Sequence, residues 1–222
     1  MNRKVRRVSQ RKVKTMPVFL SVLFLGVSLC LCSSFSYAGK TITVAVASSY
    51  YEKAKVYSTQ FEQSHDVKVR LVSGSTGRLF NQIQQGAPFD IWIAADTQRP
   101  ALLSSDHKNI GRGYLGIVTA DGMIDLKALL QSHIQHIAIA NPDVAPFGLA
   151  AKFMLERKGL WKSLQPKLVY AQNAMQASMM VHQGLTDAAF VPIADKTHAL
   201  AEIPYVAVLL SAKAQVFYDG LP

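Results

Sequence analysis

Short apolar runs alternate with amphipathic stretches along most of the chain. Residues 41–47 are mostly apolar and predict a buried strand, and the apolar spacing over 50–61 predicts a helix. The residues that set this three- and four-residue spacing are Tyr50, Ala54, Tyr57 and Phe61. The same alternation predicts further strands at 67–72, 91–95, 114–118, 136–140, 188–193 and 205–210, and further helices at 76–85, 147–158 and 174–183.

This alternation is typical of βαβ units, in which helices cover the faces of a parallel sheet. We therefore predict an α/β fold built on a mostly parallel sheet flanked by helices. The chain shows no internal repeat, low-complexity tract or long linker.

The segments that follow the predicted strands carry the candidate chemistry. In open α/β sheets, ligands bind beyond the carboxyl ends of the strands, where helices begin. Four such junctions lie at 47–49, 73–77, 141–148 and 172–174. The first two place hydroxyl groups at helix starts, where free N–H groups and the helix dipole attract anions without a formal positive charge. A single hydroxyl there can simply cap its own helix, but several junctions meeting in one cleft would form an anion site.

The first 38 residues read as a targeting signal. Seven basic residues and no acidic one precede an apolar run at 17–35, and Ser36 and Ala38 supply small residues where a signal peptidase reads. We predict export to the periplasm with cleavage after Ala38. The alternative is a retained anchor, because the apolar run is marginally long enough to span a bilayer.

Cleavage changes the charge of the chain. The full sequence has 24 basic and 14 acidic residues, a net charge of +10, and loss of the seven N-terminal basic residues leaves 17 against 14, or +3. That small excess gives no reason to expect a nucleic-acid or membrane partner. Cys30 and Cys32 leave with the signal, so the remaining 184 residues would have no disulfide or thiolate site and must rely on a hydrophobic core.

Catalysis and metal binding find little support in the sequence. The segment 73–77 is not a G-x-S-x-G elbow, and no histidine and carboxylate are placed to complete a triad, so we predict no enzyme. Only His133 and His136 are close together, on a stretch read as a solvated helix face without a carboxylate-rich ligand pattern. We expect no resident cofactor or metal.

Four segments resemble the molybdate-binding periplasmic proteins of ABC importers. They are 43–49 (TVAVASS), 74–79 (GSTGRL), 86–96 (GAPFDIWIAAD) and 137–148 (IAIANPDVAPFG). The last two are the most specific, and the resemblance spans nearly all of the chain after residue 38.

The resemblance implies a two-lobe periplasmic-binding-protein fold of type II that closes on its ligand. Residues 39–112 with 205–222 would form lobe one, and 113–204 would form lobe two. The implied function is capture of a tetrahedral oxyanion, molybdate or tungstate, between the lobes by a monomer that delivers it to an ABC permease.

By position, the resemblance places ligand contacts on five residues: Ser49, Thr76 with Ser75 beside it, Phe147 and Ala174. Phe147 and Ala174 would contribute only backbone N–H groups. The one basic residue near these junctions is Arg78, which we expect to point along the helix surface, so neutral donors are expected to carry the binding.

Two departures from the family pattern stand out. Pro192 occupies a position where some relatives supply a tyrosine hydroxyl, and proline offers neither a hydroxyl nor an N–H group. The chain also stops at Pro222, where relatives continue with another helix. We therefore expect apolar residues near the end, such as Val206, Val208 and Leu210, to be less covered.

Other readings remain open at the level of sequence. The ligand could be sulfate or another oxyanion, or ferric iron held through Tyr50 and Tyr51 at the first junction. The chain could also be a truncated, degenerate member without a transport role, kept as a sensor or interaction module.

Overall fold

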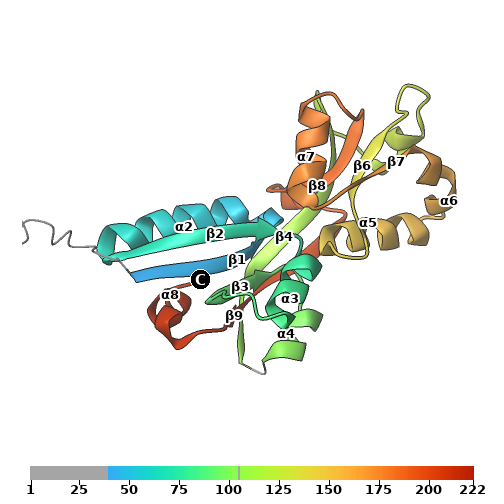
Figure 1. Cartoon of the computed structure of the whole chain (residues 1–222). Coiled ribbons are helices and arrows are strands. Elements are labelled where there is room, and N and C mark those ends of the chain that lie inside the picture. Colours follow the sequence, from blue (N-terminus) through green and yellow to red (C-terminus); the bar gives the residue numbers. More distant parts are fainter. Residues whose placement is uncertain (1–39, 105) are drawn as a thin grey trace, which may run out of the picture. The chain divides into compact units, whose positions relative to one another are not determined.

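The computed structural model describes residues 40–104 and 106–222, and its elements are drawn in Figure 1. The predicted targeting signal lies outside the described residues. The strands form one nine-stranded sheet in the order β2-β1-β3-β9-β4-β8-β6-β7, with β5 paired to β4. Their bounds are β1 Lys40–Ala47, β2 Val67–Gly74, β3 Ile91–Ala94, β4 His107–Thr119, β5 Gly122–Met123, β6 Ile137–Ala140, β7 Leu168–Ala171, β8 Ala188–Ile193 and β9 Ala201–Leu209.

Two groups of parallel strands make up most of this sheet. In the first half of the sheet, β1 pairs in parallel with β2 and β3; in the second half, β6 pairs in parallel with β7 and β8. The predicted α/β class and mostly parallel pairing within each group are confirmed.

The two halves are joined by β4 and β9, which pair antiparallel with each other. β9 also pairs antiparallel with β3, and β4 with β8, so the sheet as a whole is mixed, which parallel βαβ units alone do not predict. The two predicted lobe boundaries fall within these strands, where Arg112 faces Pro204 across the ladder. The division into lobes itself stays a prediction.

Helices follow most of the strands. The α-helices are α2 Tyr51–Ser64, α3 Thr76–Gln84, α4 Gln98–Leu103, α5 Pro146–Arg157, α6 Trp161–Leu164, α7 Ala174–His182 and α8 Gln215–Asp219. Short 3₁₀ helices are η1 Ser48–Tyr50, η2 Leu126–Leu130, η3 Gln165–Lys167, η4 Lys196–His198 and η5 Ala212–Ala214. In the part of the chain that the structure describes, no helix has both the length and the apolarity needed to cross a membrane.

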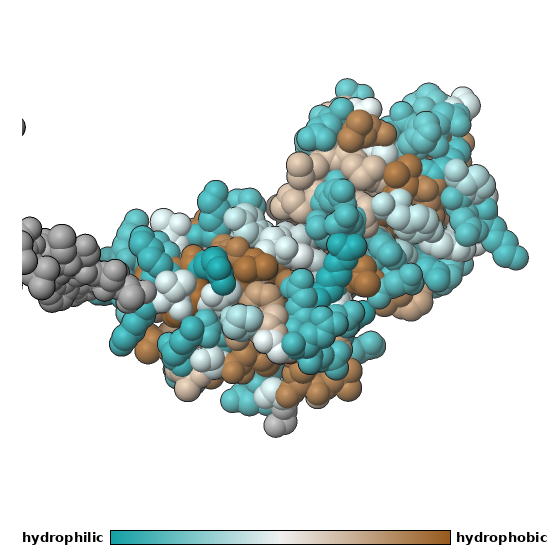
Figure 2. All heavy atoms as spheres, in the orientation of Figure 1, coloured by the Kyte–Doolittle hydropathy of each residue, from teal (hydrophilic) through white to brown (hydrophobic). Residues whose placement is uncertain are grey.

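Helices cover both faces of the first half of the sheet, which explains its continuous apolar strands. Val44 and Val46 share a core cluster with Phe61 of α2, whereas Ala45 and Leu79 of α3 belong to another. Successive strand residues point to opposite faces, so α2 and α3 lie on opposite sides of β1 (Figure 1). The molecular face drawn in Figure 2 is mainly hydrophilic, with apolar side chains scattered across it.

Two local predictions are wrong. The stretch that holds His133 and His136 is not a helix but a turn and an irregular segment before β6, because the backbone N–H of His136 donates to Oδ2 of Asp187 (2.7 Å). Val206 and Val208 were expected to be less covered but are only 1% and 0% exposed, whereas Leu210 is half-buried. The segment after β9 supplies buried side chains of its own, among them Phe217 and Leu221.

Candidate binding site

The four predicted junctions meet at one small cavity. Its volume is about 190 Å³ including the part open to solvent. The lining residues are Ala47, Ser48, Ser49, Gly74, Ser75, Thr76, Ala95, Ala145, Pro146, Phe147 and Ala174. All five residues predicted as ligand contacts are among them. Their role in binding stays a prediction, but the structure brings them together.

Helix starts from both halves of the sheet surround this cavity. From the first half, η1 leads directly into α2, and α3 begins at Thr76; from the second half, α5 begins at Pro146 and α7 at Ala174. The first N–H groups of a helix lack acceptors within the helix, and they lie at the positive end of its dipole. A small anion in the cavity would therefore meet donors from both halves.

Ser75 carries the most telling side chain in the lining. It is the N-cap residue of α3, only 4% exposed, and its Oγ has no hydrogen-bond partner in the structure. An unpaired buried hydroxyl costs about 1–3 kcal/mol, so a ligand that accepts a hydrogen bond from it would relieve that cost. Thr76 differs, because its Oγ1 already accepts a hydrogen bond from the N–H of Ala95 (3.0 Å). Its hydroxyl proton is nevertheless available to donate.

A hydrogen bond from Tyr205 fixes the backbone at Ser49. The hydroxyl of Tyr205 donates to the backbone oxygen of Ser49 (3.1 Å). Burial raises the pKa of Tyr205 to about 12, which keeps its hydroxyl protonated and able to donate. Its ring also packs against those of Tyr50 and Phe147, with centroids 4.7 and 6.5 Å away.

Tyr205 was missed by the sequence analysis, which placed it only in a strand. Strand periodicity gives no sign that a tyrosine there bonds to Ser49, a residue of the cavity lining. Gly113 on the neighbouring strand makes room for it, since a Cβ at that position would lie 2.5 Å from the tyrosine oxygen.

Among the described residues that line the cavity, there is no lysine, arginine, histidine, aspartate or glutamate. The lining side chains are therefore neutral, and the expectation that neutral donors carry the binding stays a prediction. The same lining places no general base beside Ser49 or Ser75, and a serine without a base is a poor nucleophile. Within residues 40–104 and 106–222 there is also no cluster of three or more histidine, cysteine, aspartate or glutamate side chains suited to a metal ion.

Arg78 does not run along the helix surface as expected. Its Nη1 donates to Oε1 of Gln172, which precedes α7 in the other half of the sheet (2.8 Å). The neighbouring N–H of Gly77 donates to the backbone oxygen of Val144 (2.9 Å). The α3 start is thus bonded at two points to segments of the second half, and a short-range helix pattern cannot reveal such contacts.

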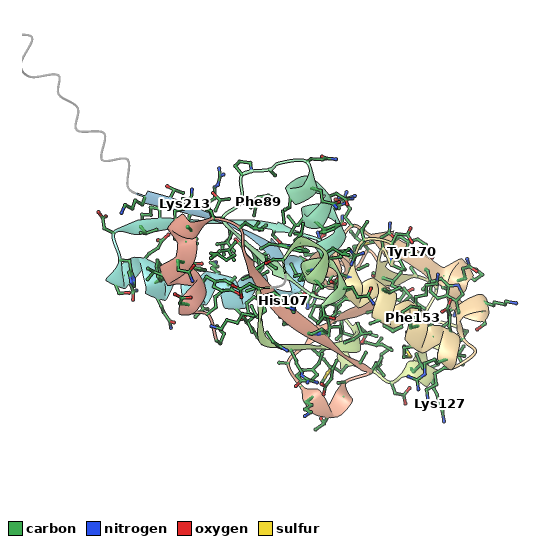
Figure 3. All side chains as sticks on the ribbon, turned by 90° about the horizontal axis from the view of Figure 1, so that it is seen from below. Phe89, His107, Lys127, Phe153, Tyr170 and Lys213 are labelled. Carbon is green, nitrogen blue, oxygen red and sulfur yellow. The ribbon has the colours of Figure 1, made fainter. Side chains whose placement is uncertain are left out.

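Two residues of the most specific sequence segments serve packing. Buried Asp90 accepts from the N–H of Thr43 (2.7 Å) and pairs with Nζ of Lys213 (3.1 Å); Lys213 is labelled in Figure 3. Gly148 lies against the end of β6, where an added Cβ would be 1.9 Å from the Ala140 oxygen. Gly148 thus brings α5 close to the carboxyl end of β6, next to Phe147 of the lining, whereas Asp90 fixes the opposite, amino-terminal end of β3.

Pro192 lies in β8 opposite Leu115 and does not line the cavity. Whether a ligand contact is lost at this position therefore stays a prediction.

A sheet in two halves, with a small cavity between the helix starts of both, defines a solute-binding protein. The chain belongs to the family described as bacterial extracellular solute-binding protein, which matches residues 42–219. This finding confirms the resemblance seen in the sequence.

Individual relatives agree with this family. The chain is 32% identical over 163 residues to the molybdate-binding protein ModA of Rhodobacter capsulatus, covering 69% of this chain and 64% of that protein. It is 31% identical over 182 residues to the molybdate-binding protein ModA of Azotobacter vinelandii, covering 78% and 71%. The solved periplasmic molybdate-binding protein of Azotobacter vinelandii has a similar fold, with a TM-score of 0.71 at 25% identity over 81% of this chain and 92% of that one.

Proposed function

We propose that this protein captures a tetrahedral oxyanion, molybdate or tungstate, in the cavity lined by Ser49, Ser75, Thr76, Phe147 and Ala174. The observation that carries the proposal is the meeting of four helix starts and an unpartnered Ser75 hydroxyl around a small cavity without charged side chains. Relatives that are named molybdate-binding proteins support the same ligand class.

The donor set suits an anion that only accepts hydrogen bonds. Hydroxyls of Ser49, Ser75 and Thr76, and backbone N–H groups at Phe147 and Ala174, can all donate to oxygens of a dianion. A protonated oxyanion such as hydrogen phosphate also needs an acceptor for its own proton, and no carboxylate lines the cavity. The lining therefore favours fully deprotonated dianions.

Ferric iron is not favoured by this cavity. Neither Tyr50 nor Tyr51 lines it, and the Tyr50 ring is buried against Tyr205. Sulfate would satisfy the same donors as molybdate, so selection between them rests on size. We propose molybdate and tungstate because of the relatives.

We further propose that the protein is exported to the periplasm, acts as a monomer without a cofactor, and hands its ligand to an ABC permease. Membership of an extracellular solute-binding family and the periplasmic relative support this assignment. Protein recovered from secreting cells should begin at Gly39; an intact Met1 on membrane-bound protein would contradict cleavage.

Calorimetric titration of the exported protein tests the ligand. Molybdate and tungstate should bind and compete with each other, whereas phosphate and ferric citrate should give no binding heat, and sulfate should bind more weakly. Preferred binding of ferric citrate, or binding of no dianion at all, would show that the proposed function is wrong. The second result would agree with a degenerate member.

A further inference from the structure

We propose that Arg78 is a positioning residue that retains the bound oxyanion by tying the α3 start to the α7 start through Gln172. The inference rests on the proposed function, since it concerns the same cavity. It assigns a role to a charged residue that does not itself line the cavity.

The bond joins two segments that each hold a wall of the cavity. Arg78 lies two residues after Thr76, and Gln172 lies two residues before Ala174, with both Thr76 and Ala174 in the lining. The Nη1 to Oε1 distance is 2.8 Å across 94 residues of sequence. A bond of this kind exists only while the two walls face each other.

On the α7 side, the bond attaches to a braced helix start. The N–H of Gln172 donates to Oε1 of Gln176 (2.6 Å), and the N–H of Gln176 donates to Oδ1 of the N-cap residue Asn173 (2.9 Å). Gln172 is therefore coupled to the first turn of α7. The bond from Arg78 to the Gln172 side chain therefore also restrains the N–H groups around Ala174.

The charge of Arg78 is not used elsewhere. Among the described residues, no carboxylate forms an ion pair with Arg78, and its recorded bond goes to the neutral amide of Gln172. A hydrogen bond with a charged donor is stronger than a neutral one, although both side chains are exposed and water weakens the bond.

The placement of this bond predicts an effect on the rate of ligand release. The ligand can enter before the bond forms, but it can leave only after the bond between the two walls breaks. Losing the bond should therefore speed release and leave association unchanged. A residue that attracts the anion from a distance would instead change the association rate.

Stopped-flow measurement of molybdate binding tests the inference on wild type, Arg78→Ala, Gln172→Ala and the double variant. Each single variant should release molybdate about threefold to tenfold faster, with an unchanged association rate. The double variant should match the single variants, because both remove one bond. Arg157→Ala is the matched control: Arg157 is exposed on α5, and no ion pair with it is recorded among the described residues.

The outcomes distinguish failure of the Arg78 role from failure of the proposed molybdate binding. Wild type that binds molybdate while Arg78→Ala releases it at the wild-type rate would overturn the positioning role alone. Additive effects in the double variant, or a slower association with unchanged release, would also overturn it. Wild type that binds no dianion would overturn the proposed function, and the positioning role with it.

Discussion

The hydroxyl of Tyr205 donates to the backbone oxygen of Ser49 at 3.1 Å, which links a strand that joins both halves of the sheet to a wall of the cavity. The bond crosses 156 residues of sequence. It fixes the peptide that presents the Ser49 side chain, so Tyr205 acts on the ligand through Ser49 and not by contact.

Tyr205→Phe should weaken molybdate binding without unfolding the protein. The ring still fills its buried site, but the Ser49 oxygen loses its donor, so we expect about threefold to tenfold weaker binding. Calorimetry measures the effect. Tyr170→Phe is the control, since Tyr170 is 51% exposed at the surface (Figure 3); equal losses in both variants would contradict the role of the Ser49 bond.

Ser75 and Thr76 should separate binding from stability. Ser75→Ala removes an unpaired buried hydroxyl, so binding should weaken about tenfold to a hundredfold while the melting temperature holds or rises.

Thr76→Val also removes the acceptor of the Ala95 N–H, so its melting temperature should fall. Ser49→Ala should lose binding to a similar degree as Ser75→Ala. Full binding by Ser75→Ala would remove that hydroxyl from the ligand contacts.

Binding should depend only weakly on ionic strength. In the described part of the chain, no charged side chain lines the cavity, and salt screens exposed charges such as Arg78 over about 10 Å at 0.1 M. Titrations at two salt concentrations should therefore give similar affinities. A steep loss of affinity in high salt would show that distant cations, rather than helix starts, hold the dianion.

Asp187→Asn should destabilise the protein at neutral pH and less so in acid. The N–H groups of His136 and Gln135 donate to this carboxylate and lower its pKa below the ordinary 3.8. A lowered pKa stabilises the fold above the ordinary pKa, and that contribution is lost as the pH falls through the lowered value. Melting temperatures of the two proteins should thus converge as the pH is lowered below 3.8; a constant difference would contradict the linkage.

Gly148→Ala should damage both stability and binding. Its new Cβ would lie 1.9 Å from the Ala140 oxygen, so α5 must shift at the point where Phe147 reaches the cavity. We expect a loss of about 1–3 kcal/mol in the free energy of unfolding, together with weaker binding. Denaturant titration measures the stability, and calorimetry measures the binding. Ala150→Ser, at a half-buried position of the same helix, should change both much less.

The sequence predicted what depends on neighbouring residues. Apolar runs mark the strands, and the polar junctions after them mark helix starts. The family resemblance then placed the expected contacts at those junctions, on Ser49, Ser75, Thr76, Phe147 and Ala174. The strand β7 was missed because its apolar run, Leu168–Ala171, is only four residues long, and periodicity cannot assign so short a run to a strand or a helix.

Contacts between distant segments could not be predicted in the same way. The antiparallel pairing of β4 with β9, the Tyr205 bond to Ser49 and the Arg78 bond to Gln172 all depend on how remote segments pack. Charge and periodicity alone placed Arg78 on a free helix surface, since nothing local in the sequence indicates an amide acceptor 94 residues away.

The pair formed by β4 and β9 also bears on the entropy of ligand capture. The chain passes between the two halves of the sheet along both strands, and their ladder holds these passages together, with an irregularity between Asn109 and Gly111. A double tether keeps each set of donors at a high effective concentration relative to the other. An anion that meets one wall therefore recruits the second wall without the translational loss that two separate proteins would suffer.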